Sequence, residues 1–267
     1  MYFVMKSGAY SLAKSDVLPV IYQMVLACGV LLSAANCLHA QKENKSITSD
    51  SVKDDFDIKN SSFLLPLPLP AGQYHHAISV RNVIVPKDWA LDNIQAPFFN
   101  YSAKYTLPKG FNLQGSLSSL FISNQIALGP FWNYSIDNYH FGIGYQVVFD
   151  YGILNQFGFK TTLTGWEQQP SITAGYSFKK SAIILRGDMY YTNVLHLNEG
   201  GNVLTVSNGF TNGYGLTATL EERLWADHLF SFGVKVAHIK YHLVAWPAFP
   251  VNNYRYYVPE FILGLKF

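Results

Sequence analysis

From Phe98 to its last residue, Phe267, the chain alternates between apolar and polar or small side chains with a period of two. In residues 139–149 the odd positions are all aromatic or branched aliphatic, while the even positions include His140, Gly142 and Gln146. The same alternation returns in residues 157–164 and 171–178. A period of two is typical of β-strands whose two faces meet different surroundings. The pattern therefore predicts an all-β chain.

The predicted strands are long. Ten candidates follow one another at 98–107, 110–122, 126–136, 139–150, 154–164, 169–179, 182–192, 213–224, 229–241 and 255–267. Most have about 10–13 residues, close to the 9–11 tilted residues that cross a bilayer, whereas soluble strands have about five or six. We expect a transmembrane antiparallel up-and-down β-barrel of about ten strands, with eight or twelve also open. A soluble β-sandwich is the alternative, and it would place its polar faces outward.

Composition favours the membrane. Only 13% of the residues are charged, against about 25% in soluble domains. Aromatic residues make up 16%, and Tyr suits a boundary that is apolar on one side and wet on the other. The net charge of +2, without a basic patch, argues against a nucleic-acid partner. We therefore expect outer-membrane lipid to surround the barrel.

Charged residues fall on the face opposite the apolar one. An Arg or Lys that faces lipid at the bilayer midplane costs about 2–4 kcal/mol, so these residues should point into the lumen. They are Lys104, Lys160, Arg186, Asp188, Glu221, Arg223, Lys235, Glu260 and Lys266. Opposite charges in a narrow lumen pair with one another, which favours a filled, salt-bridged core. A narrow, slightly anion-favouring pore for small solutes is the alternative.

Two N-terminal segments precede the predicted barrel. Residues 1–40 combine Lys6 and Lys14 with a long apolar run and a small residue, Ala40, before the expected cut, which predicts a cleaved signal peptide. An uncleaved anchor is the alternative. Cleavage would remove both cysteines, Cys28 and Cys37. Residues 41–96 are expected to form a disordered or plug-like periplasmic extension, with the barrel at 97–267. Within this extension, alternating prolines in 63–70 predict an extended run, and 78–85 have strand propensity.

The connections between strands give an expected orientation. Short periplasmic turns are predicted near 123–124, 150–153, 179–181 and 225–228. The longest loops are expected at 193–212 and 242–254. The second loop carries Trp246 and Phe249, which indicate either a surface for an extracellular or periplasmic partner or an aromatic anchor in the membrane boundary.

The last predicted strand carries the strongest likeness to a known class. Tyr257, Phe261, Leu263, Leu265 and Phe267 share one face, and the chain ends on an aromatic residue. This strand resembles the C-terminal recognition strand of outer-membrane barrels, and with the Ala40–Gln41 junction the chain resembles a small Bacteroidota-type outer-membrane barrel. The resemblance covers about 170 residues and implies insertion by the barrel-assembly machinery. It implies no specific activity.

The sequence offers only weak candidates for a catalytic site or a metal site. Ser207-Asn208-Gly209, with His196 nearby, resembles the serine of barrel lipid hydrolases, but Thr205 stands where their histidine is expected. His238 and His242 lack further ligands for a metal. We therefore expect no metal and no cofactor. The leading hypothesis is a non-enzymatic barrel with a structural, binding or minor transport role, followed by a narrow pore and then by a lipid hydrolase.

Overall fold

A computed structural model of the chain describes residues 56–86, 94–155, 160–200, 202–225, 228–243 and 254–266. The predicted signal peptide and residues 41–55 lie outside the described residues, as do Trp246, Phe249 and Phe267.

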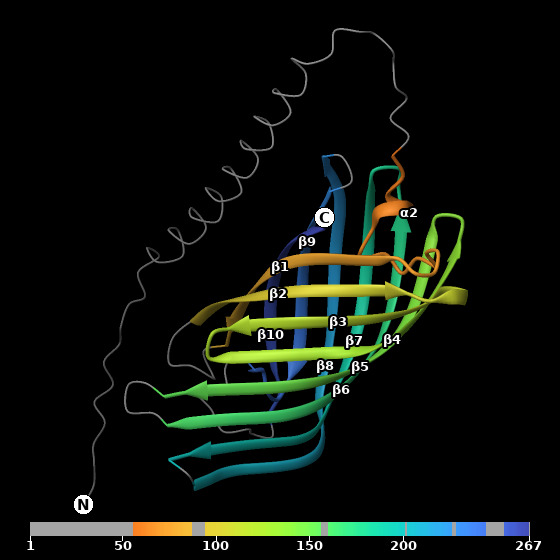
Figure 1. The fold of residues 1–267 in the computed structure, drawn as a ribbon. Coiled ribbons are helices and arrows are strands. Elements are labelled where there is room, and N and C mark those ends of the chain that lie inside the picture. The colour runs from red at the N-terminus through yellow and green to blue at the C-terminus, as the bar shows by residue number, and fades with distance from the viewer. Residues whose placement is uncertain are drawn as a thin grey trace, which may run out of the picture. The chain divides into compact units, whose positions relative to one another are not determined.

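Ten antiparallel strands close into one barrel, in which each strand pairs with its neighbours in sequence and β10 pairs with β1 (Figure 1). The strands are β1 Tyr74–Val85, β2 Ile94–Thr106, β3 Phe111–Leu120, β4 Ser123–Ile136, β5 Tyr139–Leu154, β6 Thr161–Ser177, β7 Ser181–Glu199, β8 Asn202–Trp225, β9 His228–Ile239 and β10 Tyr256–Lys266. A short helix, α2 Ile58–Ser61, precedes β1, and a 3-10 turn, η1 Pro108–Gly110, joins β2 to β3. The predicted fold class and strand number are confirmed.

Two errors in the predicted strands compensate for one another. Residues 78–85, expected to belong to the extension, are part of β1, so the barrel begins at Tyr74 and not at residue 97. The candidates 154–164 and 169–179 are mostly one strand, β6, of 17 residues. Odd-numbered residues of β6 point inward from Thr161 to Ser177, but the apolar side chains change faces, since Leu163 lies in an apolar cluster inside the barrel whereas Ile172 faces outward; this interrupts the alternation in the sequence. One missing strand and one divided strand leave the count unchanged.

The same errors explain why the four predicted periplasmic turns do not all lie at one end of the barrel. We call the end of the barrel that holds Tyr74 and Lys266 the terminal end; it carries the β2–β3, β4–β5, β6–β7 and β8–β9 connections. The predicted turns near 179–181 and 225–228 lie there, but those near 123–124 and 150–153 lie at the opposite end. Because the prediction leaves out β1, it makes each strand from β2 to β5 cross the barrel in the opposite direction. Dividing β6 into two strands corrects the direction of the strands that follow it.

The predicted long loop at 193–212 is instead a hairpin. Strands β7 and β8, of 19 and 24 residues, are separated only by residues 200 and 201. The other long loop, expected at 242–254, falls in the connection from β9 to β10, at the opposite end.

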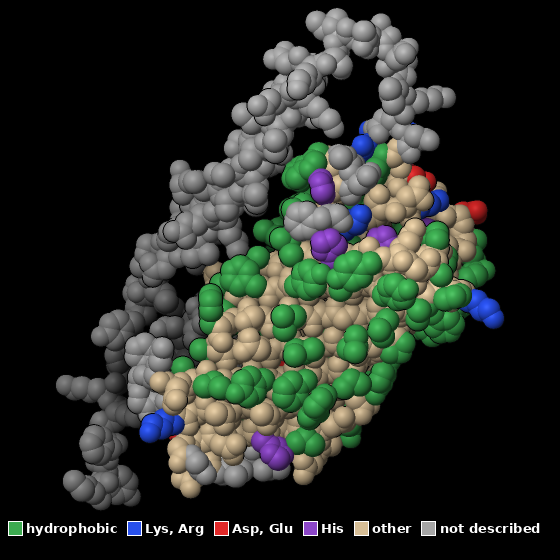
Figure 2. Space-filling view, in the orientation of Figure 1, with side chains coloured by type: hydrophobic (Ala, Val, Ile, Leu, Met, Phe, Trp, Pro, Cys, Tyr) green, Lys and Arg blue, Asp and Glu red, His purple; other side chains and the backbone are tan. Residues whose placement is uncertain are grey.

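The outer wall of the barrel is apolar. Outward side chains at mid-strand are large and exposed, among them Ile143 at 57%, Ile172 at 68% and Leu216 at 61%. Figure 2 shows such side chains spread over the wall in view, with the charged side chains toward its ends. A soluble protein rarely exposes an apolar surface of this extent, so a lipid bilayer is the solvent that this wall fits. Within the described ranges, no helix has the length and apolar character needed to span a membrane.

The lipid-facing wall should tolerate charge only near its ends. Val147 lies at the middle of β5 and Tyr139 at its first residue, and both side chains point outward. We expect Val147→Arg to lower the free energy of unfolding by about 2–4 kcal/mol, and Tyr139→Arg by about 1 kcal/mol or less, because the charge reaches water there. Urea unfolding in lipid vesicles measures both. Equal losses for the two variants would contradict the membrane placement of the wall.

Candidate functional site

The chain places residues that directly precede β1 inside the barrel. We call residues 56–70 the lumen segment. Its helix α2 is capped by Asp57, whose carboxylate accepts a hydrogen bond from the backbone N–H of Lys59 at 3.0 Å. The Lys59 ammonium donates to the backbone oxygen of Asp137 at 3.0 Å and to the side-chain oxygen of Asn138 at 2.7 Å, both in the β4–β5 turn. These contacts hold α2 at the terminal end of the barrel.

Beyond α2 the lumen segment runs extended, as its alternating prolines predict. The side-chain amide of Asn133 donates to the backbone oxygen of Leu67 at 3.0 Å. Two glycines of the wall make room for the segment: a Cβ at Gly142 would lie 2.7 Å from Pro66, and one at Gly175 would lie 2.6 Å from Leu65. The segment therefore packs directly on the inner backbone of β5 and β6.

A buried carboxylate and a buried ammonium hold the middle of the lumen segment. Glu221 accepts hydrogen bonds from the Ser62 hydroxyl and, at 3.2 Å, from the backbone N–H of Phe63. The Lys104 ammonium donates to the backbone oxygen of Phe63 at 2.9 Å. Lys104 and Glu221 are each only 1% exposed. Two of the predicted lumen charges therefore hold the segment in place.

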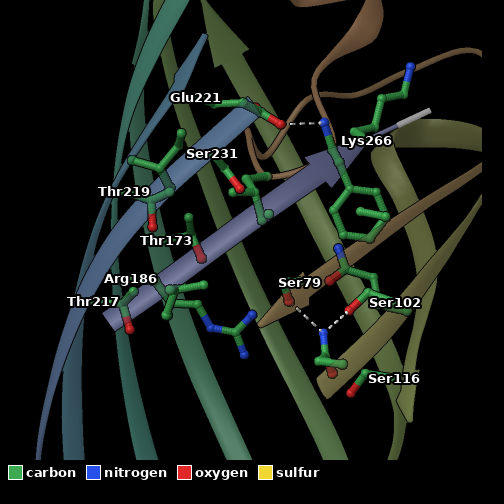
Figure 3. Close-up of a pocket in the computed structure, with 18 of the residues that line it drawn as sticks. Ser79, Ser102, Ser116, Thr173, Arg186, Thr217, Thr219, Glu221, Ser231 and Lys266 are labelled. Carbon is green, nitrogen blue, oxygen red and sulfur yellow. Dashed lines mark hydrogen bonds between the residues drawn. The ribbon is translucent and has the colours of Figure 1, made fainter. Parts of the chain in front are cut away.

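A cavity of about 250 Å³ lies inside the barrel beside the lumen segment, whose residues 63–66 line part of it (Figure 3). Asn100 organises one side of it, donating to the hydroxyls of Ser79 at 3.2 Å and Ser102 at 2.8 Å. The labelled hydroxyl groups around the cavity are those of Ser79, Ser102, Ser116, Thr173, Thr217, Thr219 and Ser231. Hydroxyl and amide groups of this kind bind water or small polar solutes.

Ion pairs fill the lumen beside this cavity. The Glu260 carboxylate, fully buried, lies 2.9 Å from the Lys235 ammonium, 3.4 Å from the His242 ring and 3.9 Å from the Arg81 guanidinium. Asp188 accepts from Arg186 at 2.8 Å. His242 follows the end of β9, and burial lowers its pKa although Glu260 acts in the opposite direction. These groups neutralise one another inside the wall.

Apolar clusters lie at both ends of the polar interior. The cluster at the opposite end contains Val83, Val85, Ala96, Phe98, Leu163, Tyr190, Leu195, Leu197, Ala237, Ile239, Tyr241, Leu243 and Val258. The cluster at the terminal end joins the lumen segment to the wall and contains Phe56, Ile58, Leu65, Leu67, Ala182, Ile184 and Leu229. The cavity thus lies between two barriers.

Most of the predicted lumen charges face the interior. Lys104, Arg186, Asp188, Glu221, Lys235, Glu260 and Lys266 line the cavity or its ion pairs. The Arg223 guanidinium lies over the Phe56 ring at 4.2 Å. Lys160 is a correction, because it is exposed in the β5–β6 connection, just before β6 begins.

Three charged residues that face the interior were not predicted from the sequence. Arg81 belongs to β1, which was assigned to the extension, and Glu167 lies in the gap between the two candidate strands that form β6. Asp150 was placed in a turn, although its even position in β5 continues the inward phase of His140 and Gln146. That phase is the signal that could have found it.

The predicted assembly strand is β10. Tyr257 and Phe261 point outward, and Leu263 and Leu265 continue the same phase, half-buried. Recognition of this strand by the barrel-assembly machinery stays a prediction.

The residues of the two candidate chemical sites lie on strands β7 to β9 and in the connection after β9. Ser207 pairs with Leu195 in the β7–β8 hairpin, and His196 pairs with Val206. His238 stacks on Tyr257 with ring centroids 4.5 Å apart, whereas His242 contacts Glu260 in the lumen, so the two histidines do not share a site. No group of three metal-ligating residues occurs in the described part of the chain.

Comparison with known proteins gives structural likeness only. No family model and no curated protein matches the sequence. Neisserial surface protein A is 13% identical, covering 74% of this chain and 98% of its own, with a TM-score of 0.38. The translocator domain of the autotransporter NalP from Neisseria meningitidis is 10% identical, with coverages of 88% and 96% and a TM-score of 0.36. The KdgM porin is 10% identical, with coverages of 72% and 98% and a TM-score of 0.34. Such low scores carry no argument about function.

The Glu260 ion pairs should be essential for stability. We expect Glu260→Gln to lower the free energy of unfolding by about 3–5 kcal/mol, because it leaves Lys235 and Arg81 buried without a counter-charge. Adding Lys235→Met should regain part of the loss. Urea unfolding of the purified barrel measures each variant. Glu199→Gln, an exposed carboxylate, is the control and should change stability by less than about 0.5 kcal/mol. A loss no larger than that of the control would contradict the assignment.

Proposed function

We propose that the chain is an integral outer-membrane barrel without catalytic activity, whose lumen is closed at rest and whose role is structural or binding. The observation that carries this proposal is the lumen segment held across the terminal end by Lys104, Asn133 and Glu221. In this proposal the terminal end faces the periplasm, since every connection there is short and the longest connections, β1–β2 and β9–β10, lie at the opposite end.

Two observations support closure. The lumen segment fills the terminal end, and the apolar cluster around Phe98, Leu163 and Ile239 fills the opposite end. A ten-stranded barrel has a narrow interior, so a single chain segment and one layer of side chains fill much of its width. Ions would have to cross both barriers.

The use of the interior charges supports a non-enzymatic role. Glu221 and Lys104 hold the lumen segment, while Lys235 and Arg186 pair with carboxylates. Groups committed in this way stabilise a folded interior and do not present a nucleophile beside a base. The expected partners remain outer-membrane lipid, the barrel-assembly machinery during insertion, and a partner of the loop with Trp246 and Phe249, which lies outside the described residues.

A narrow pore for small solutes is the second candidate. The cavity of about 250 Å³ favours it, because its hydroxyl and amide lining suits a polar solute in transit. In that case both barriers would have to move.

Electrical recording separates these two functions. The full chain in a planar bilayer should show no discrete conductance steps at moderate voltage, because both ends of the lumen are filled. Reconstitution is checked by the heat-dependent shift of the band in gel electrophoresis. Reproducible single-channel steps from the folded protein would overturn the closed-lumen proposal in favour of the pore.

Chemical labelling tests the lumen segment as the terminal barrier. Side chains added at Gly142 and Gly175 would collide with Pro66 and Leu65 and displace the segment. In a chain with Cys28 and Cys37 replaced by Ala, a cysteine introduced as Ser116→Cys in the cavity should react with a charged thiol reagent at least tenfold faster when Gly142→Leu and Gly175→Leu are added.

The exposed position Lys160→Cys is the matched control and should react equally fast in both backgrounds. An unchanged rate at Ser116→Cys, with the control unchanged and the barrel folded, would contradict the barrier role of the segment.

A further inference from the structure

A second, smaller cavity lies in the lumen between the central cavity and the apolar cluster of the opposite end. It has a volume of about 70 Å³, enough for a small ion with a few waters. It shares Arg81, Gln125, Gln169 and Lys235 with the lining of the central cavity, so the two adjoin. The other polar residues that line it are Asp150, Glu167, Tyr190, Asn212, Tyr241 and His242.

Two carboxylates face this small cavity from neighbouring strands. In the β5–β6 ladder Glu167 pairs with Val148 and Asp150 pairs with Gly165, which makes the two acids diagonal neighbours on the inner face. Asp150 is 1% exposed and Glu167 is 7% exposed. Because both are buried, their mutual repulsion is weakly screened.

Only neutral groups bind these two carboxylates. Asp150 accepts a hydrogen bond from the amide of Gln125 at 2.9 Å. Glu167 accepts from the Thr192 hydroxyl at 2.7 Å and from the Asn212 amide at 3.3 Å. In the described ranges neither carboxylate forms an ion pair. Buried carboxylates without a cation are costly, which indicates that a positive charge is missing here.

The charge balance of this half of the lumen gives the size of that missing charge. Its basic side chains already have partners, since Lys235 and Arg81 face Glu260 and Arg186 pairs with Asp188. Burial lowers the pKa of the His242 ring, which favours its neutral form. The carboxylates are Asp150, Glu167, Asp188 and Glu260, and the cations are Arg81, Arg186 and Lys235. With all of them ionised, one negative charge remains.

An oxygen atom without a partner points to the same place. Tyr241, in the β9–β10 connection, is only 7% exposed and lines the small cavity, yet its hydroxyl has no hydrogen-bond partner among the described residues. Gln125 and Gln169 use their amide N–H groups on Asp150 and Asp188, which leaves their amide oxygens as acceptors. Carboxylate, amide and phenol oxygens are hard ligands of the kind that alkali cations take.

We propose that this cavity binds one small monovalent cation, Na⁺ or K⁺, between the carboxylates of Asp150 and Glu167, with the Tyr241 hydroxyl as a further ligand. The cation neutralises the remaining charge of this half of the lumen. It also links the β5–β6 wall to the connection that follows β9, beneath the apolar cluster at the opposite end.

Thallium(I), a monovalent cation of nearly the size of K⁺, serves as the probe. In equilibrium dialysis, the purified full chain in detergent should bind one Tl⁺ per chain, and K⁺ or Na⁺ should displace it. The isosteric double variant Asp150→Asn/Glu167→Gln should weaken binding at least tenfold, and Tyr241→Phe several-fold. Glu199→Gln, an exposed carboxylate at the same end of the barrel, should bind as the unchanged chain does.

Thermal unfolding gives a second readout that does not need the probe. The unfolding midpoint of the unchanged chain should be several degrees higher in KCl or NaCl than in choline chloride of equal ionic strength, since choline is too large for the cavity. The double variant should show no such difference.

Absence of Tl⁺ binding, or binding that survives the double variant, overturns the proposal. So do equal midpoints in KCl, NaCl and choline chloride, which would indicate that the two carboxylates share a proton instead. Conductance measurements do not enter these tests, so the cation site and the closed lumen stand or fall separately.

Discussion

Closure of the sheet is the constraint on which the other features depend. In a bilayer no water is present to bind exposed backbone N–H and C=O groups, so an open sheet edge is excluded. The pairing of β1 with β10, from Ala77 opposite Lys266 to Val83 opposite Glu260, removes that edge. Once the sheet is closed, its two faces meet lipid and lumen, and the period of two along each strand assigns every side chain to one of them.

The lumen then has to provide partners for the charged and polar side chains that the lipid-facing side of the sheet excludes. Charges such as Arg186, Lys235 and Glu260 point inward and form ion pairs, within β7 for Arg186 and between β9 and β10 for Lys235 and Glu260, because a lone buried charge is far more costly than a pair. The lumen segment completes this arrangement: its backbone supplies an acceptor to Lys104 and a donor to Glu221. The same contacts thus stabilise the barrel and close it.

The sequence predicted features that depend on local periodicity. The phase of β10 and the inward charges of β7 and β8 follow from alternation within a strand, whereas the number of strands was right only because a missed β1 and a divided β6 compensate for one another. The change of the apolar side chains from the inner face at Leu163 to the outer face at Ile172 hid the continuity of β6, although its backbone keeps one phase. The site of the lumen segment was beyond local patterns, since Ser62 and Glu221 meet although they are 159 residues apart. Likewise, Asp150 and Glu167 become a pair only after β5 and β6 are placed in register.

The long β7–β8 hairpin gives the barrel an uneven rim. At about 3.3 Å per residue and a tilt near 45°, the 24 residues of β8 span roughly 55 Å along the membrane normal, against a hydrocarbon core of about 30 Å. The short turn between β8 and β9 keeps the terminal end level with the neighbouring strands, so the excess height belongs to the opposite end. Strands β5 to β8 pair with one another up to this end, with Leu154 opposite Thr161 and Thr161 opposite Glu199, so a four-stranded part of the sheet rises beside the mouth there. A molecule that approaches the membrane from that side meets its tip, at Glu199 and Asn202, before it reaches either the lipid or the lumen.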